Sequence, residues 1–302
     1  MRRPRPLARG STVRVIEPSS PFEREKLPAG LKVLADIGLV PVHSDRIFQA
    51  DGYLAGPDLL RARELVAAFS TEPGDAVIPA RGGYGSMRIL DEAARHAGAM
   101  EPRLFMGFSD ITSLHLFFLT AGDLTTFHGP NVISMARLEP ASLARLRAAL
   151  HGTDPADTFT FGGLVPLTGG AARGRVVAGN LSLVTAMIGT RYAAPLCGSI
   201  LALEDVSEPA YRVDRMLQQI RMQPNASGIA GFAFGDMGVD EAERPLLERL
   251  LKRFAEAMGK PAVMGFPIGH GTVNFPVPEG AQASLDADVG VLRVLDDPYD
   301  RS

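Results

Sequence analysis

The chain has 302 residues, enough for two ordinary domains, and its 46% hydrophobic and 22% charged residues are typical of a globular protein with a sizeable core. A net charge of −3 gives no electrostatic attraction to nucleic acid or to an anionic membrane. The single cysteine, Cys197, excludes an internal disulfide and a cysteine-based zinc cluster, and without an apolar leader or a membrane-spanning run a cytoplasmic location is expected.

Strands and helices alternate regularly through the first half of the chain. Short apolar or β-branched runs are each followed by a segment with helical spacing, with Gly38 as a helix stop and Asp58 as a helix cap. Strands are expected at 13–16, 39–42, 76–79 and 104–108, and helices at 22–37, 58–69, 87–97 and after Ser109. This alternation predicts an α/β domain over residues 1–150 with a doubly wound parallel sheet, flavodoxin-like or Rossmann-like.

The second half has a less regular pattern. A polar, glycine-rich interval over residues 151–172 shows no sustained period and is interpreted as a linker. Beyond it, strands are expected at 175–177, 200–203, 229–234 and 262–264, helices at 181–188, 211–221 and 241–258, and a strand hairpin at 282–295. Residues 173–302 are therefore predicted to form a mixed α/β domain.

Ser109 stands where the apolar run 104–108 passes into a helical segment. A serine at such a corner is a candidate nucleophile, because the tight turn exposes its hydroxyl and the free N–H groups of the helix can stabilise an oxyanion. Serine is also a common helix cap, and Ile111 replaces the second glycine of the usual G-x-S-x-G turn. The corner alone leaves both interpretations open.

The loop from Arg81 to Gly85 follows a predicted strand and holds three glycines in four residues. Such a loop lets the backbone approach a ligand closely and direct N–H groups at an anion. A dinucleotide fingerprint is incomplete, since Arg88 stands where the third glycine belongs, and no Walker-type phosphate loop is present. An ordinary tight turn explains these glycines almost equally well.

Candidates for a general base and its acid partner lie at other predicted strand ends. His270, flanked by two glycines, follows an apolar strand and is well placed for proton transfer, with His128 as a second contender. Glu204 and Asp205 end a buried strand, where an unpaired charge is costly and an imidazolium is a suitable partner. Because successive strand residues point to opposite faces, only one of these acids is expected to serve the site. Purely structural roles stay open for each.

Together these segments resemble the LD-carboxypeptidase family, cytoplasmic serine peptidases that trim murein tetrapeptides and whose relatives include the microcin C immunity peptidases. The resemblance covers nearly the whole chain. Phe108 and Ala178 depart from the family pattern, where tyrosine and a second glycine are common, which affects fine specificity rather than the reacting groups. The motifs occur in a fixed order at Ala80–Gly85, Gly107–His115, Phe127–Pro130, Gly179–Leu183, Leu203–Val206 with Tyr211–Leu217, and Gly265–Gly271.

The resemblance implies a catalytic set of Ser109 as nucleophile, His270 as general base and Glu204 as the acid that orients the imidazole. It further implies an oxyanion hole formed by the backbone N–H groups of Gly83 and Asp110. The nucleophile belongs to the first half and the other two groups to the second, so the site is expected at the domain junction, a common place for ligand pockets.

Candidates for substrate binding are Arg81, Tyr84 and Arg212; for the two arginines, a structural ion pair is an equal alternative. No H-E-x-x-H motif and no Cys/His cluster is present, so no metal or other cofactor is expected. The resemblance also implies a homodimer. The expected partner is a small peptide, a murein tetrapeptide, rather than a nucleic acid or a membrane.

The function indicated by this resemblance is metal-independent hydrolysis of an L,D-peptide bond, releasing the terminal D-alanine of a murein tetrapeptide in peptidoglycan recycling. One alternative is hydrolysis of peptidyl- or aminoacyl-nucleotides, as in the microcin immunity branch. Those relatives stack the base on a tryptophan in an inserted loop, and this sequence has no tryptophan. A catalytically silent protein that binds murein fragments is an alternative of another class, which the complete set of Ser109, Glu204 and His270 argues against.

Overall fold

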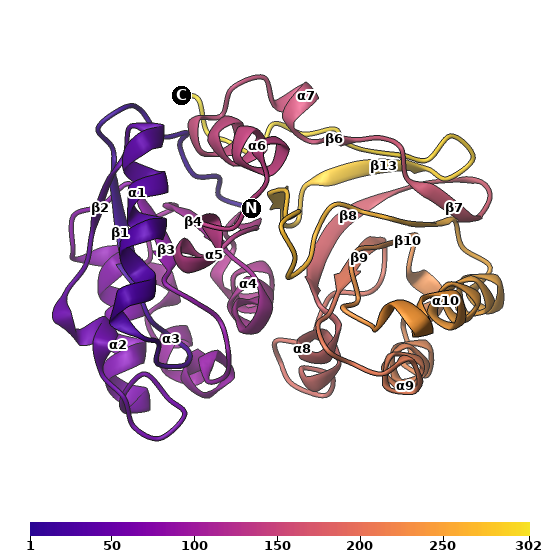
Figure 1. Cartoon of the computed structure of the whole chain (residues 1–302), viewed down its shortest axis with the longest axis horizontal. Helices are drawn as coiled ribbons and strands as arrows, with labels where there is room; N and C mark the ends of the chain where they lie inside the picture. The colour runs from indigo at the N-terminus through magenta and orange to yellow at the C-terminus, as the bar shows by residue number, and fades with distance from the viewer.

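The computed structural model describes residues 1–302, which form two α/β halves side by side (Figure 1). The first half contains a six-stranded sheet of order β12-β5-β4-β3-β1-β2. Its first five strands in chain order run parallel, and their order β2-β1-β3-β4-β5 is that of flavodoxin-like folds, which confirms the predicted parallel sheet. The strands are β1 (Thr12–Ile16), β2 (Val40–Val42), β3 (Ala76–Pro79), β4 (Leu104–Gly107), β5 (Phe127–His128) and β12 (Val277–Pro278).

Helices flank this sheet, and their bounds differ from the predicted ones at several points; the helix predicted over 87–97 is limited to Leu90–Ala94, after a 3₁₀ turn over Ser86–Ile89. The first helix begins at Leu27 rather than residue 22, because Pro28 is tolerated only in the first turn, and a 3₁₀ turn precedes it. Asp58 is the first residue of its helix rather than the cap, which is Pro57, and its carboxylate pairs with Arg88 at 2.7 Å. The helices are α1 (Leu27–Ile37), α2 (Asp58–Ser70), α3 (Leu90–Ala94), α4 (Thr112–Phe117), α5 (Val132–Met135) and α6 (Pro140–His151).

The second half contains an eight-stranded mixed sheet of order β6-β14-β13-β8-β9-β10-β11-β7. Four central strands, β8 to β11, run parallel, and the outer strands pair antiparallel. The predicted hairpin is the pair β13–β14. The strands are β6 (Thr160–Phe161), β7 (Val165–Thr168), β8 (Ala171–Asn180), β9 (Ser199–Glu204), β10 (Gly231–Phe234), β11 (Ala262–Met264), β13 (Gln282–Asp286) and β14 (Val291–Val294).

Three helices, α8 (Leu181–Ala186), α9 (Ala210–Arg221) and α10 (Arg244–Met258), lie along one side of this sheet (Figure 1). The interval 151–172, predicted as a linker, holds the short helix α7 (Pro155–Thr158) and the strands β6 and β7. These two strands form the opposite edges of the eight-stranded sheet. With only two and four residues, they offer too few alternating positions to stand out in the sequence.

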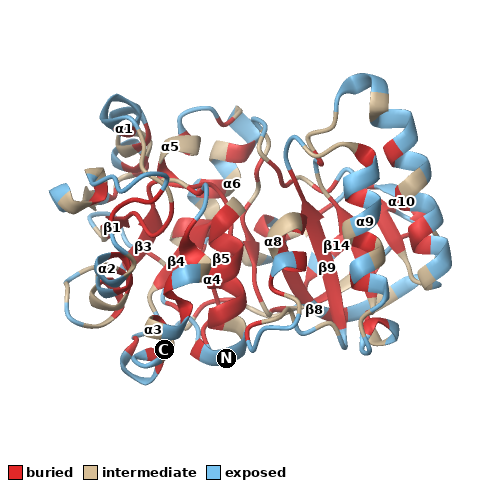
Figure 2. Ribbon diagram, turned by 90° about the horizontal axis from the view of Figure 1, so that it is seen from below, coloured by how far each residue is buried: buried red, intermediate tan, exposed pale blue.

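The two halves are joined by intimate packing at the carboxyl end of β8. The backbone N–H of Asn180 donates to the Thr112 hydroxyl at 3.0 Å, and a Cβ on Gly179 would lie 2.5 Å from the Thr112 methyl. Strand β12 crosses from the second half to pair with β5. Both hydrophobic clusters of the core contain residues from the two halves, and buried segments run through both sheets (Figure 2). None of the helices combines the length and apolarity needed to cross a bilayer.

Candidate active site

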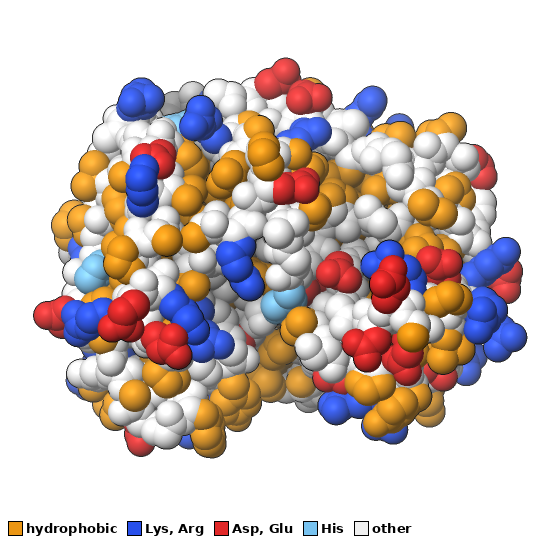
Figure 3. Space-filling view, in the orientation of Figure 1, with side chains coloured by type: hydrophobic (Ala, Val, Ile, Leu, Met, Phe, Trp, Pro, Cys, Tyr) orange, Lys and Arg blue, Asp and Glu red, His pale blue; other side chains and the backbone are white.

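A cavity of about 800 Å³ opens beside the carboxyl ends of β1, β3 and β4, where ligands of doubly wound sheets bind. Its wall comes from the loops after these strands, from α1 and α5, and from His270 of the second half. The space-filling view shows a hollow between the halves with a histidine in it and a basic side chain beside that histidine (Figure 3). The predicted location at the domain junction agrees with this arrangement.

Ser109 occupies the turn between β4 and α4 in a left-handed conformation, with φ of 65°. A non-glycine residue rarely adopts this conformation, and where it does the strain often marks a functional turn. The following helical turn is capped by Phe108 with no side-chain cap bond, so Ser109 is not a helix cap. Gly82 lies against it, because a Cβ there would be 3.0 Å from the Ser109 Cβ. The serine therefore sits exposed to the cavity at a strained corner.

His270 and Glu204 form a hydrogen-bonded pair at the carboxyl ends of the second sheet. The Nδ1 atom of His270 donates to Oε2 of Glu204 at 2.7 Å, and Glu204 is fully buried as the last residue of β9. Asp205 points the other way, bonded to Asn180 and Ser182 at 3.0 and 2.8 Å, as strand alternation predicts. With its Nδ1 proton held by the carboxylate, the neutral ring of His270 presents an unprotonated Nε2.

The electrostatics of this pair favour a charged imidazole. Burial lowers the pKa of His270, but the hydrogen bond and negative charge of Glu204 outweigh that effect, so the pKa of His270 is raised above its ordinary value. Burial also raises the pKa of the Glu204 carboxyl, which the contact with His270 opposes. A histidine that gains a proton readily while held by a carboxylate is suited to act as a general base.

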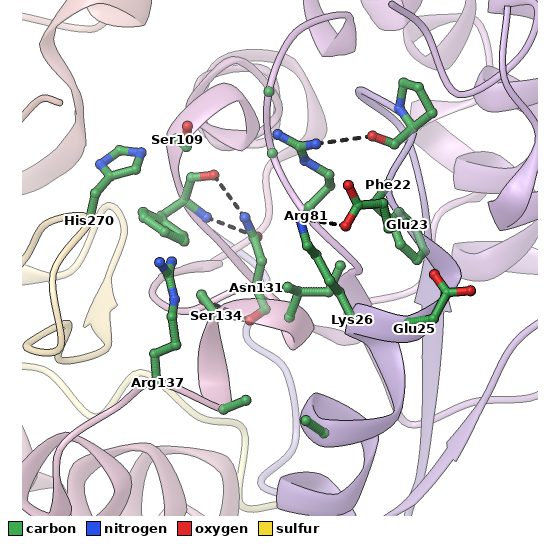
Figure 4. A pocket seen from close by; sticks show the side chains of 17 residues that line it. Phe22, Glu23, Glu25, Lys26, Arg81, Ser109, Asn131, Ser134, Arg137 and His270 are labelled. Carbon is green, nitrogen blue, oxygen red and sulfur yellow. Dashed lines mark hydrogen bonds and ion pairs between the residues drawn. The ribbon is translucent and has the colours of Figure 1, made fainter. Parts of the chain in front are cut away.

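Ser109 and His270 line the same cavity from opposite halves of the molecule (Figure 4). The structure contains no hydrogen bond between the serine hydroxyl and the ring. Such bonds are often long before substrate binds, so the arrangement is compatible with proton transfer from Ser109. No three His, Cys, Asp or Glu side chains are grouped to hold a metal ion.

The predicted oxyanion donors belong to the segments around Ser109: Gly83 follows Gly82, which lies against Ser109, and Asp110 follows Ser109 itself. The Gly83 backbone N–H lines the cavity with its loop and has no protein acceptor. Asp110 follows the serine, and its buried carboxylate accepts hydrogen bonds from the Ser19 hydroxyl at 2.6 Å and the Ser86 N–H at 2.8 Å. Asp110 therefore ties the serine turn to the loops after β1 and β3.

The predicted substrate-binding residues are dispersed. Arg81 lines the cavity, with one guanidinium nitrogen 3.0 Å from the carbonyl oxygen of Pro21. Tyr84 is exposed outside the cavity and packs edge-on against Tyr53. Arg212 lies on α9, outside the cavity, in an ion pair with Glu208 at 2.7 Å.

His128, the second contender for the base, is fully buried and does not line the cavity. Neither of its ring nitrogens has a hydrogen-bond partner, and burial holds its pKa well below the ordinary value. His115 is buried too, bonded to the Thr126 hydroxyl and the Gly107 carbonyl at 2.8 Å each. His270 is the histidine that the fold brings to the cavity.

Sequence reasoning missed several polar residues of the cavity wall, namely Glu23, Glu25, Lys26, Asn131, Ser134 and Arg137. The side-chain amide of Asn131 brackets Phe108, accepting from its N–H at 3.3 Å and donating to its carbonyl at 3.4 Å. Asn131 directly precedes α5, whose four residues are too few for a helical period, so the sequence carries no signal for this contact.

Comparisons with known proteins identify the family of this chain. Residues 13–129 match the LD-carboxypeptidase N-terminal domain and residues 173–285 match the LD-carboxypeptidase C-terminal domain. A putative carboxypeptidase of Streptomyces coelicolor is 41% identical, covering 98% of this chain and 96% of its own. The murein tetrapeptide carboxypeptidase of Pseudomonas aeruginosa is 33% identical over 91% of this chain and 93% of its own. The chain belongs to the LD-carboxypeptidase family.

Solved structures show how widely the LD-carboxypeptidase fold is shared. The muramoyltetrapeptide carboxypeptidase from Oxalobacter formigenes superimposes with a TM-score of 0.81 at 24% identity, covering 96% of this chain and 99% of that one. The microcin C7 self-immunity protein MccF superimposes with a TM-score of 0.86 at 20% identity, each chain covered to 99%. At these identities the likeness establishes the two-half fold, and the substrate has to be argued from the site.

Proposed function

We propose that this protein is a serine-type LD-carboxypeptidase that releases the terminal D-alanine of a murein tetrapeptide. The observation that carries the proposal is the His270–Glu204 pair, bonded at 2.7 Å, on the same cavity as the strained Ser109. A base held by a buried carboxylate and a serine on an exposed turn are the parts of a catalytic triad, which is recognised by geometry and roles.

In the proposed reaction, the Ser109 hydroxyl oxygen attacks the carbonyl carbon of the scissile bond and its proton passes to Nε2 of His270. The resulting imidazolium is stabilised by Glu204, and it then donates the proton to the departing amine of D-alanine. Water attacks the acyl-enzyme with His270 again as base, which frees the tripeptide and restores Ser109.

The negative oxygen of each tetrahedral intermediate needs hydrogen-bond donors. We assign this role to the backbone N–H groups of Gly83, in the loop whose Gly82 lies against Ser109, and of Asp110, which follows Ser109 in the chain. The free N–H of Gly83 supports the assignment, since a preorganised donor without a protein acceptor is available to the oxyanion. Two such donors supply a large share of the rate enhancement in acyl-transfer enzymes.

The substrate class is inferred from relatives and from the wall of the cavity. The relatives named murein peptide carboxypeptidase in Bacillus subtilis and murein tetrapeptide carboxypeptidase in Pseudomonas aeruginosa are 34% and 33% identical to this chain. The cavity wall carries Glu23, Glu25, Lys26, Arg81 and Arg137. Charges of both signs suit a short peptide that bears carboxylates and ammonium groups.

Hydrolysis of an aminoacyl-nucleotide is the competing activity, and it is suggested by the MccF structures, one of them in complex with aspartyl sulfamoyl adenosine. A nucleotide base needs a flat aromatic surface, and the chain has no tryptophan. The aromatic side chains of the cavity wall are Phe22 and Phe108 alone, and Phe108 packs against His270 with ring centroids 4.7 Å apart. The murein peptide is therefore the favoured substrate.

A digest of two substrates tests the assignment. The purified protein is incubated with L-Ala-D-Glu-diaminopimelate-D-Ala and, separately, with an aminoacyl-adenylate analogue, and products are separated by chromatography. We expect free D-alanine from the first and little cleavage of the second. Efficient cleavage of the analogue with an untouched tetrapeptide would overturn the proposal, and failure of Ser109 to react with a fluorophosphonate in the folded protein would favour a binding protein.

The cytoplasmic location and the homodimer stay predictions from the family resemblance. Light scattering of the purified protein measures the second.

A further inference from the structure

An enzyme that removes a single terminal residue must recognise the carboxylate that ends its substrate. In a peptide this carboxylate follows the scissile carbonyl by one residue, a spacing of about 3.8 Å between consecutive Cα atoms. The cation that binds this terminal carboxylate must therefore lie close to the nucleophile, on the side of the leaving group. We propose that Arg137 is this cation and so determines the specificity for a free C-terminus; the inference rests on the proposed carboxypeptidase function.

Three cationic side chains line the cavity, and two of them are already engaged. Lys26 forms an ion pair with Glu23 at 2.9 Å. Arg81 donates from its guanidinium to the Pro21 carbonyl at 3.0 Å, and its backbone N–H is bonded to the buried Glu17 at 3.0 Å. Arg137 has no carboxylate within salt-bridge distance and its guanidinium donates no hydrogen bond in this structure.

Arg137 lines the cavity, and in Figure 4 its guanidinium points toward the side on which Ser109 and His270 lie. In the same view, Glu23 and Glu25 lie at the far side of the cavity, beyond Arg81. A substrate carboxylate on this side of the cavity thus meets the positive charge of Arg137, while the acidic side chains of the cavity wall lie on the other side. The ammonium groups of a peptide are better accommodated at the acidic side.

The position of Arg137 is fixed relative to the nucleophile by the start of α5. Asn131, just before this helix, brackets the backbone of Phe108, which precedes Ser109. At the other end of α5 the backbone N–H of Arg137 is bonded to the Ser134 carbonyl at 3.1 Å. One short, rigid segment therefore carries both the amide that braces the nucleophile turn and the arginine. Pre-organisation of this kind is what a positioning contact needs.

Arginine is also the appropriate side chain for the task. Its planar guanidinium binds a carboxylate through two parallel N–H···O bonds, which reports orientation as well as charge. A lysine at the same place would keep the positive charge but could not form the two parallel hydrogen bonds. This difference predicts a graded series of variants.

The test compares a peptide that ends in a carboxylate with the same peptide as its C-terminal amide. For the wild type we expect kcat/KM to favour the acid by on the order of 10²-fold, because a charge-assisted pair is lost with the amide. Arg137→Ala should lower kcat/KM for the acid by a similar factor and leave the amide nearly unaffected, so that the preference disappears. Arg137→Lys should retain part of it. The matched control is Arg147→Ala, because Arg147 is exposed on α6 and lies outside the cavity; this variant should keep the full preference for the acid.

A second measurement separates this inference from the proposed activity. Calorimetry with Ser109→Ala protein reports binding of the acid and the amide without turnover, with and without Arg137→Ala. A binding preference for the acid that vanishes in the double variant supports Arg137 even for a protein that hydrolyses neither peptide, an outcome that would refute the proposed activity alone. Normal hydrolysis by Arg137→Ala with the acid preference intact would overturn the inference and leave the peptidase function standing.

Discussion

Replacing Glu204 by glutamine removes one charge from the acid–base pair while keeping the shape of the side chain. In the wild type, His270 donates from Nδ1 to Oε2 of Glu204, and the second carboxylate oxygen, Oε1, is buried without a hydrogen-bond partner. In Glu204→Gln, an amide whose oxygen faces His270 leaves its NH₂ group buried and unpaired, at a cost of about 1–3 kcal/mol. The reversed amide donates to Nδ1 and forces the ring proton onto Nε2, which is the wrong tautomer for a base.

Both orientations therefore impair His270, and the expected loss in kcat is roughly 10⁴-fold, the effect of an equivalent charge removal in a serine triad. This corresponds to about 5 kcal/mol of transition-state stabilisation. The pH dependence of the rate provides an independent test of the role of Glu204. In the proposed mechanism neutral His270 is the base, so the rate should rise with pH through the pKa of His270, which in the wild type is raised above its ordinary value by Glu204. Without the charge of Glu204, burial lowers the pKa of His270, and the acid limb should move to lower pH.

The assay is kcat/KM for D-alanine release between pH 5 and pH 9, with urea unfolding to verify that the variant is folded. Glu101→Gln serves as the matched control, because this glutamate forms an exposed ion pair with Arg103 at 3.0 Å, away from the cavity. Its profile should superimpose on that of the wild type. A folded Glu204→Gln protein with an unshifted acid limb and near-normal turnover would refute the role given to Glu204.

Three further predictions concern the proposed catalytic pair, the glycine packed against Ser109, and the buried His115. Ser109→Ala and His270→Ala should each lower kcat by on the order of 10⁶-fold with the double variant hardly worse, measured by single-turnover kinetics; additive losses would contradict a coupled pair. Gly82→Ala places a methyl group 3.0 Å from the Ser109 Cβ and should reduce kcat by about 10²-fold, whereas Gly98→Ala, with open space around it, should not; equal turnover of the two would refute the close approach. Burial lowers the pKa of His115 to about 4. The folding stability that depends on its neutral ring is therefore fully present above pH 6.5 and is lost as the pH falls toward 4, by about 3 kcal/mol. Urea unfolding at pH 7 and pH 4 should show this loss in the wild type and a smaller loss in His115→Gln.

The parallel sheet and the serine corner could be predicted because their signals are local. Four of the five parallel strands follow from apolar runs between helical segments, and Ser109 stands where one period gives way to another. The loop from Arg81 to Gly85 is indicated by its three glycines in four residues. Each of these inferences needs only a few consecutive residues, and each was placed within a few residues of its position in the structure.

The pairing of Glu204 with His270 is of another kind, because 66 residues separate the partners. Spacing in the sequence provides no measure of their distance in the fold. The family resemblance, and not the periodicity, is what predicts that Glu204 and His270 act together. Strand β12 was missed for the same reason: two residues near the C-terminal end pair with β5 in the opposite half. Arg137 was missed because an isolated charge after a four-residue helix looks like any solvated surface residue.

In the proposed mechanism, the division of the site between the halves makes their junction part of the catalytic apparatus. Ser109 is carried by the turn that leads into α4, and the first residue of α4 is Thr112, whose hydroxyl accepts the Asn180 N–H at the end of β8. Asn180 in turn bonds Asp205, the neighbour of Glu204 on the adjacent strand. A short chain of contacts therefore runs from the Ser109 turn to the strand end that carries Glu204, the hydrogen-bond partner of His270. Because tightly packed interiors transmit small shifts, we expect the contact between Thr112 and Gly179 to influence how Ser109 lies relative to His270.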